Sequence, residues 1–392
     1  DQQYYSFELK YHLQNPSISQ GISQVALPPD TAYQKFVYAS IQPKPSKIET
    51  DIDGNWIATF EVGAQKDLTV IAKGVAAVYL KPTVLVPVTS TKHLLSDSTF
   101  WQTQDFTIQD LSKKLKTTRE IYDYLTKNFS YDYRRLVLAD QRRRGAVEAL
   151  KIPDQTLCQE FTDTFIAVMR AQGIPARELN GFAYTENPKL RPSSLIGDLL
   201  HAWPEYYDDA KKQWVQIDPT WGNTTNGVDF FTKLDFNHIV FAIHGQSPEK
   251  PYPAGMYKIA GKEEKDVEIK IIPTAQFPTL SLALTPPSVM SPNTITIENQ
   301  TGAAWYDVPI QITTSASLHV AGKKPTITLL PYQKMELEIP VEPSSIIVGG
   351  NGTVTVTIGE ESIRYDTSSG RISTTTLVGI GLGLCSLIAG GV

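Results

Sequence analysis

The chain has 392 residues and a net charge of −5, so it is too long for one ordinary domain and offers no electrostatic reason to expect a nucleic-acid partner. Hydrophobic residues make up 41% and charged residues 20%, which argues against disorder. Two cysteines exclude a disulfide framework, and no Cys and His spacing typical of zinc occurs, so we expect neither a metal nor another cofactor.

Residues 1–95 have the pattern of β-structure. From Tyr5 to Leu13, apolar and polar residues alternate, which predicts a half-buried strand. A turn around Asp53 and Gly54 precedes a second alternating run from Trp56 to Val62, which predicts a hairpin. We therefore predict an N-terminal β-sandwich-like domain.

Residues 96–255 change to a mixed pattern. Apolar spacing predicts helices over 110–129, 145–150 and 159–172, and Gly173 followed by Pro175 ends the last of them. Strand patterns follow at 176–184, 202–207 and 213–217. Helices before several strands are typical of an α+β domain.

The rest of the chain is predicted to be β-structure and then an apolar tail. Residues 270–370 alternate with frequent turns, which predicts an Ig-like β-sandwich. Leu377 to Val392 is uncharged and mostly apolar, so residues 374–392 are predicted to be a transmembrane segment, cut short in this chain. A buried terminal strand or helix is the alternative. We thus predict a multidomain protein.

Cys158 is the only thiol outside the apolar tail, and it begins a predicted helix with Thr156 as a plausible N-cap. The partial positive charge of a helix N-terminus stabilises a thiolate, and its unpaired N–H groups can hold an oxyanion. These properties suit a nucleophile. The structural alternative is a small buried hydrophobic residue, the usual role of a free cysteine.

His201 begins one predicted strand and Asp218 ends the next. The link at 208–212 is short and polar, which predicts an antiparallel hairpin that brings the start of one strand beside the end of the other. His201 would then meet Asp218 as a base meets its orienting carboxylate. Taken singly, each residue has a structural explanation: a satisfied histidine and a turn aspartate.

His238 and His244 are competing bases without an Asp-Pro-Thr partner of their own. We rank His201 ahead and expect His238 to support the site or to lie in the substrate cleft. Asn180 and Tyr184, on the strand after the Cys158 helix, are further candidates for the cleft.

The arginines at 134, 135 and 142–144 form a local basic cluster. We interpret it as a solvated helix end or loop, and binding of a phosphate or an acidic ligand is the alternative.

Five motifs resemble the transglutaminase-like superfamily over about residues 105–245. They are Cys158–Phe161, Gly173–Arg177, Gly181-Phe182, His201–Trp203 and Trp214–Thr220. The resemblance implies a papain-like fold, with a cysteine helix packed on an antiparallel sheet. It also implies that Cys158 attacks a carbonyl to give a thioester, that His201 carries the proton and that Asp218 holds His201.

One position departs from the family pattern. Eukaryotic transglutaminases have a tryptophan directly after the cysteine, and this chain has Gln159, which weakens a cross-linking role. The resemblance makes Gln159, Trp203 and Trp221 candidate substrate-binding residues, although packing explains the tryptophans equally well.

The sequence therefore predicts a thiol enzyme acting on protein or peptide amides, as a cysteine peptidase or amidase. The alternatives are a protein-glutamine gamma-glutamyltransferase and a non-catalytic scaffold for adhesion or envelope organisation. The apolar tail predicts a location at the cell surface or outside the cell, with membrane contact through that tail. The oligomeric state is left open.

Overall fold

The computed structural model describes residues 1–84, 86–87, 91–137, 142–193, 198, 200–260, 264–322, 326–344 and 350–369. The chain divides into two compact units, Asp1–Phe277 and Pro278–Val392. The predicted membrane segment, 374–392, lies outside the described residues. Among the helices that are described, none combines the length and apolar character needed to cross a bilayer.

The first unit begins with two antiparallel sheets, as the alternating patterns predict. The four-stranded sheet has the order β11 (Val267–Ile272), β1 (Gln2–Asn15), β6 (Lys66–Tyr79) and β3 (Gln34–Gln42). The three-stranded sheet has the order β2 (Gly21–Leu27), β5 (Trp56–Val62) and β4 (Lys47–Thr50). Because β11 follows the central region and pairs with β1, the N-terminal and central parts of this unit are joined by a shared sheet.

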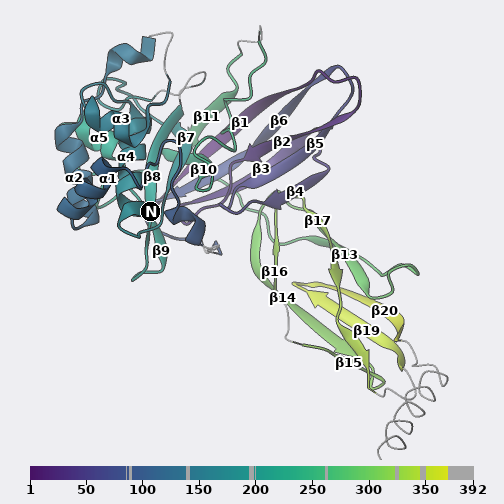
Figure 1. The fold of residues 1–392 in the computed structure, drawn as a ribbon. Coiled ribbons are helices and arrows are strands. Elements are labelled where there is room, and N and C mark those ends of the chain that lie inside the picture. Colours follow the sequence, from purple (N-terminus) through teal and green to yellow (C-terminus); the bar gives the residue numbers. More distant parts are fainter. Residues whose placement is uncertain are drawn as a thin grey trace, which may run out of the picture. The chain divides into compact units, whose positions relative to one another are not determined.

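The central region of the first unit is α+β. Its short and long helices are η1 (Lys92–Leu95), α1 (Phe106–Lys114), α2 (Thr118–Asn128), η2 (Tyr133–Val137), α3 (Gly145–Lys151), α4 (Cys158–Ala171) and α5 (Pro219–Thr224). Its sheet has the order β10 (His238–His244), β7 (Ala176–Ala183), β8 (Leu200–Asp208) and β9 (Gln213–Gln216). Helices α1 to α5 gather on one side of β7 and β8, and the N-terminal strands lie on the other (Figure 1).

The helix predicted over 110–129 is two helices instead of one. Thr117 caps α2: its hydroxyl accepts from the Glu120 backbone N–H at 3.2 Å, and the Glu120 carboxylate accepts from the Thr117 N–H at 2.9 Å. This reciprocal capping box satisfies backbone donors that a continuous helix would not leave open. It explains why a new helix begins at Thr118.

Strand β10 lies at the edge of the central sheet, and amide side chains from the N-terminal strands cover its outer backbone. The Gln34 side chain accepts from the Val240 N–H at 2.8 Å and donates to the Val240 carbonyl at 2.9 Å. Asn55 makes the same pair of bonds with Ile243, at 2.7 Å and 2.8 Å. A buried edge strand needs such partners for its N–H and C=O groups. The N-terminal strands thus hold β10 in place.

The second unit contains only strands among its described residues. They form a sheet of β12 (Leu282–Thr285), β13 (Thr294–Asn299) and β17 (Lys334–Glu338), a sheet of β16 (Thr326–Leu329), β14 (Trp305–Thr314), β19 (Gly350–Ile358) and β20 (Glu361–Ser369), and the pair β15 (Leu318–Val320) and β18 (Val341–Pro343). One apolar cluster, which includes Ile295, Ile310 and Val356, joins these strands. The Ig-like assignment of this unit remains a prediction.

Gly181 allows β7 and β10 to approach closely. It pairs with His201 on one side and with Val240 on the other, next to a bulge between Val240 and Ala242. A Cβ at this position would lie 1.9 Å from the Ile239 carbonyl oxygen, so a side chain must push β10 away.

Replacing Gly181 by alanine should therefore lower the free energy of unfolding by about 1–3 kcal/mol, the usual range for overpacking. Thermal or denaturant unfolding measures this change. Gly63→Ala is the matched control, because its nearest neighbour is the flexible end of the Lys66 side chain. Equal stability of the two variants would contradict the close-approach argument.

Candidate active site

Cys158 is the first residue of α4 and is fully buried. Two features of the local sequence place it there. The Glu160 carboxylate accepts from the Leu157 backbone N–H at 2.8 Å and so caps the helix from its first turn. The helix then packs its apolar residues against the sheet, and the Thr162 hydroxyl donates to the Ala202 carbonyl of β8 at 3.3 Å. The thiol therefore sits beside the strand that carries His201.

The prediction that Thr156 caps α4 is wrong. The N-cap is Leu157, whose side chain makes no capping hydrogen bond. The Thr156 hydroxyl instead donates to the Ser130 carbonyl at 2.9 Å. It anchors the segment before the helix to the segment after α2.

The predicted hairpin is confirmed: β8 and β9 pair antiparallel, with Glu205 opposite Gln216. His201 Nε2 donates to Asp218 Oδ2 at 3.0 Å, and both side chains have no exposed surface. The other oxygen, Asp218 Oδ1, accepts from the Trp221 backbone N–H at 3.0 Å and caps α5. Asp218 is thus held in place by the start of α5 while it holds His201.

The second ring nitrogen of His201, Nδ1, is buried and has no nitrogen or oxygen partner among the described residues. Because Nε2 is taken by Asp218, Nδ1 is the nitrogen left for the thiol. Burial lowers the pKa of His201, but the charge and hydrogen bond of Asp218, followed by those of Cys158, outweigh it and raise the pKa to about 9. His201 is therefore an imidazolium at neutral pH, with Cys158 on one side and Asp218 on the other.

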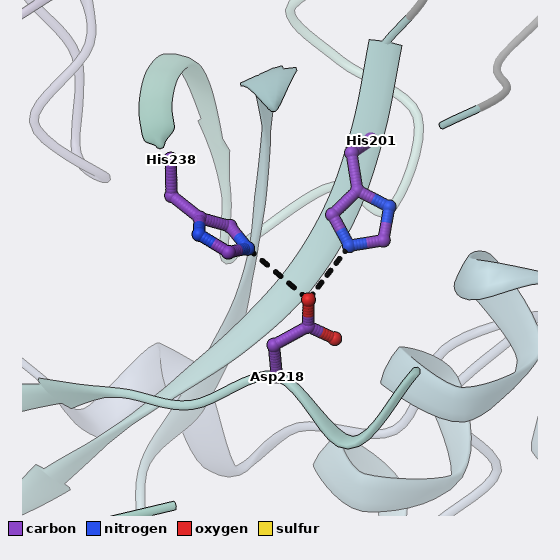
Figure 2. Close-up of side chains that lie close together, drawn as sticks. All are labelled: His201, Asp218 and His238. Atoms are coloured by element: carbon purple, nitrogen blue, oxygen red, sulfur yellow. Dashed lines mark hydrogen bonds and ion pairs between the residues drawn. The ribbon is translucent and has the colours of Figure 1, made fainter. Parts of the chain in front are cut away.

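His238 supports the site, as the sequence analysis expects, and it does so by contacting the same carboxylate. Its Nε2 lies 3.1 Å from Asp218 Oδ2, and its Nδ1 lies 2.8 Å from Asp235 Oδ1. Figure 2 shows both histidine rings pointing at one oxygen of Asp218. His238 has no Asp-Pro-Thr motif of its own, yet it has two carboxylate partners. The only sequence signal was Asp235, three residues before it.

The two predicted tryptophans pack on His201 and have no exposed surface. Their rings stack on the imidazole with centroid distances of 5.8 Å for Trp203 and 5.2 Å for Trp221. Trp221 Nε1 donates to the Pro192 carbonyl at 3.1 Å. Both hold the ring orientation of His201. Gln159, the third predicted substrate-binding residue, is partly exposed next to Cys158 on α4.

Tyr131 is a site residue that the sequence did not reveal. It lies in the segment before η2, pairs with Thr156 through an isolated bridge, and is 7% exposed. Burial and, after it, the nearby Cys158 raise the pKa of Tyr131, so its hydroxyl stays protonated. That hydroxyl has no hydrogen-bond partner among the described residues, which leaves a neutral donor near the thiol. No local motif marks such a residue.

Asn180 and His244 do not lie at the thiol. The Asn180 amide donates to Glu178 Oε1 at 2.6 Å and contacts His244 Nδ1 at 3.0 Å. His244 ends β10, whereas His238 begins it, so the two histidines mark opposite ends of one strand. Tyr184 follows β7 and is partly exposed. His244 is thereby separated from the Asp218 carboxylate.

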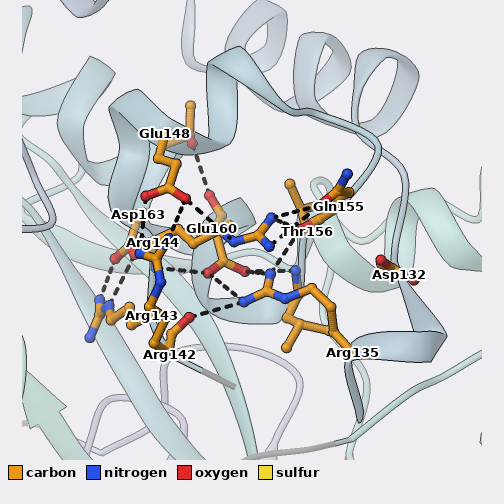
Figure 3. Close-up of polar contacts among 12 residues, drawn as sticks. Asp132, Arg135, Arg142, Arg143, Arg144, Glu148, Gln155, Thr156, Glu160 and Asp163 are labelled. Carbon is orange, nitrogen blue, oxygen red and sulfur yellow. Dashed lines mark hydrogen bonds and ion pairs between the residues drawn. The ribbon is translucent and has the colours of Figure 1, made fainter. Parts of the chain in front are cut away.

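The arginine cluster is ion-paired rather than a solvated basic patch, except at its margins. Arg135 is 3% exposed and donates to Glu160 at 2.9 Å (Figure 3). Arg143 lies between Asp163 of α4 and Glu178 of β7, which both accept from its guanidinium. Arg134 and Arg142 keep most of their surface exposed. Carboxylates neutralise the buried arginines. The charge of these arginines therefore no longer argues for a bound phosphate or acidic ligand.

One group of potential metal ligands occurs within the described ranges: His201, Asp218 and His238, whose atoms lie within 4.8 Å of one another. Both Nε2 atoms point at the same carboxylate oxygen, at hydrogen-bond distance. Nitrogens that donate protons to a carboxylate have no lone pair for an ion. The geometry is that of a hydrogen-bond chain.

The arrangement can perform nucleophilic chemistry. A thiol at a helix N-terminus, an imidazole beside it and a buried carboxylate behind the imidazole supply a nucleophile, a proton carrier and an orienting group. The unpaired backbone N–H groups in the first turn of α4 lie at the helix N-terminus, next to the thiol, and favour a negatively charged oxygen there.

Cys158, His201 and Asp218 lie in a part of the chain that matches a known family. The sequence model described as the transglutaminase-like superfamily matches residues 102–219. No curated protein matches the sequence. Among solved structures, a candidate cysteine protease from Cytophaga hutchinsonii is 18% identical with a TM-score of 0.46, and the match covers 71% of this chain and 93% of that one.

Two further structures are less similar. The periplasmic domain of TgpA from Pseudomonas aeruginosa, bound to ethylmercury, is 14% identical with a TM-score of 0.30, over 56% of this chain and 91% of that one. Red sea bream transglutaminase is 12% identical with a TM-score of 0.26, over 93% and 80%. The family assignment rests on the sequence match alone and concerns this part of the chain: residues 102–219 form a transglutaminase-like domain.

Proposed function

We propose that this protein is a cysteine-dependent enzyme that cleaves amide bonds in proteins or peptides. The observation that supports it best is the buried line from Cys158 through His201 to Asp218, in which Asp218 holds Nε2 and leaves Nδ1 for the thiol. A scaffold has no need for this arrangement of a thiol, an imidazolium and a carboxylate.

The proposed reaction has two steps. The Cys158 sulfur bonds to the amide carbon, the C–N bond breaks, and the amine leaves with a proton from His201. Water then attacks the thioester carbon and gives a proton to His201, and the C–S bond breaks. This releases the acid and returns Cys158 to the thiolate that began the reaction, beside protonated His201. The same thioester would pass to an amine if an amine replaced water, which is the cross-linking alternative.

Alkylation of Cys158 by iodoacetamide, mapped by mass spectrometry to separate it from Cys385, tests the activated thiol. Because His201 keeps its proton up to about pH 9, a cation lies beside the Cys158 sulfur and favours its reaction with an alkylating agent. We expect labelling already at pH 6, and His201→Ala should slow it at least about tenfold at that pH. Labelling that begins only above pH 8 in both proteins would refute the enzyme hypothesis.

Activity against casein and a labelled amine separates the two reactions. Hydrolysis predicts new termini in casein and no incorporation of the amine. Cys158→Ala should produce neither new termini nor incorporated amine. Incorporation of the amine into glutamine side chains would favour the transferase. Turnover should decline as the pH passes about 9, because His201 then loses the proton that the leaving amine requires.

A surface location follows only from the apolar tail and stays part of this proposal. Fractionation of cells that express the full chain, with and without residues 374–392, would test it.

A further inference from the structure

His238 is enclosed between two carboxylates. Its side chain has no exposed surface, and the Asp218 and Asp235 oxygens lie 3.1 Å and 2.8 Å from its two nitrogens. Its ring packs against Trp221 at 4.5 Å and Trp203 at 4.8 Å. It begins β10, whose outer edge is bound to the N-terminal strands through Gln34. The ring is therefore fixed on all sides.

These two contacts require both ring nitrogens to carry protons. An ionised carboxylate only accepts hydrogen bonds, so each nitrogen that faces one must donate. The pKa of Asp218 is held well below its usual range: burial opposes ionisation, but His201 and His238 outweigh it. The pKa of Asp235 is also lowered, chiefly by His238 against the effect of burial. With both acids ionised, His238 is an imidazolium.

The charges around His238 support this state. Asp218 and Asp235 face its nitrogens, and the His201 ring lies 5.8 Å from its own ring. Arg191 acts on Asp235 from outside. The neutral hydroxyls of Tyr5 and Tyr122 lie near Asp235 and Asp218, and burial raises the pKa of each. Burial lowers the pKa of His238, and Asp235, followed by Asp218, more than compensates and raises it to about 9.

The shared oxygen couples this cation to His201. Both histidines donate to Oδ2 of Asp218, because Oδ1 is already used to cap α5. A carboxylate that is partly neutralised by one cation holds a second proton less tightly. We propose that His238 is a buried imidazolium, fixed by Asp235, that shares the Asp218 carboxylate with His201 and sets how tightly Asp218 holds the His201 proton. This role of His238, as a positioning residue for the proposed reaction, rests on the proposed function.

The test follows the six histidine rings by nitrogen NMR in the full chain labelled at histidine, assigned with single His→Gln variants. His238 should have both nitrogens protonated at pH 7. In His238→Gln, which removes the cation, the titration midpoint of His201 should rise by about 0.5–2 pH units, the effect expected of one charge at this distance. Asp235→Asn should also raise the titration midpoint of His201, and this variant keeps the His238 ring in place.

His244→Gln is the matched control. His244 is also buried on β10, but its Nε2 contacts the Pro251 carbonyl at 2.7 Å, and it does not contact Asp218. The His201 midpoint should not move in this variant. A neutral His238 in the wild type at pH 7, or a His201 midpoint unchanged in Asp235→Asn, would overturn the proposal.

The two proposals fail separately. Alkylation of Cys158 at pH 6 in the wild type depends on the activated thiol, whereas the NMR titration requires no activity. If the thiol is not activated while the His201 midpoint still shifts, the proposed function fails and the coupling of the two histidines stands. An activated thiol with no shift leaves the enzyme proposal intact and removes the role of His238.

Discussion

Replacing Asp218 by asparagine should slow turnover by about 10³–10⁴-fold, as expected when the histidine of a triad is held in the wrong tautomer. The oxygen of the introduced side-chain amide can still accept from the Trp221 N–H, so the cap of α5 is retained. The amide nitrogen then faces His201 Nε2 and donates to it. The proton of neutral His201 moves to Nδ1, the nitrogen left for the thiol, and His201 can no longer accept a proton there.

The measurement is the rate of casein hydrolysis together with the rate of Cys158 alkylation at pH 6, and both should fall. Asp229→Asn is the control, because Asp229 follows α5, is partly exposed and pairs with Arg119 at the surface. It should leave both rates unchanged. Turnover of Asp218→Asn within tenfold of the wild type would mean that Asp218 does not orient the base.

Replacing Arg143 by methionine should lower the free energy of unfolding by about 3–5 kcal/mol, the cost of leaving buried charges without their partner. The Arg143 side chain is 8% exposed, and Asp163 and Glu178 have no exposed surface. One cation serves two carboxylates, so burial raises the pKa of Asp163 to about 7 while Arg143 outweighs burial and holds the pKa of Glu178 near 2. Without Arg143, both acids lose their main counter-charge.

Two variants test the cause of that loss. Arg142→Met removes the neighbouring arginine, which is 59% exposed and pairs with Glu148, and should cost about 0–1 kcal/mol. Combining Arg143→Met with Asp163→Asn and Glu178→Gln removes the uncompensated charges and should recover part of the stability. Denaturant unfolding checks both. Equal losses in Arg142→Met and Arg143→Met would show that the buried network contributes no more than a surface pair.

Local patterns predicted much of the central region. Alternation and helical spacing located α4, β7, β8 and β9 to within a few residues, because each buries a face whose period is visible along the chain. The polar link between β8 and β9 was enough to predict the hairpin that joins His201 to Asp218. The break between α1 and α2 was also readable, since Thr117 and Glu120 have the spacing of a capping box that apolar periodicity alone obscured.

Other features depend on contacts between distant segments. The arginines were interpreted as solvated charge because their partners, Glu160, Asp163 and Glu178, belong to α4 and β7 and lie at least 20 residues away in the sequence. Likewise, β11 pairs with β1, although most of the first unit separates the two strands in the sequence. No local pattern predicts which strand will be the neighbour of β11.

The sequence by itself was enough to propose Cys158, His201 and Asp218 together as nucleophile, base and orienting acid. The reason is that a helix start and a hairpin are local structures, so a short stretch of sequence fixes where their residues lie. Only the tertiary structure decided that His238 shares Asp218, that Asp235 holds His238 and that Tyr131 lies near Cys158. The physical reason is that hydrogen bonds between buried side chains depend on which strands become neighbours and in what register. That choice is made by the packing of the whole unit, including the amide side chains that secure β10.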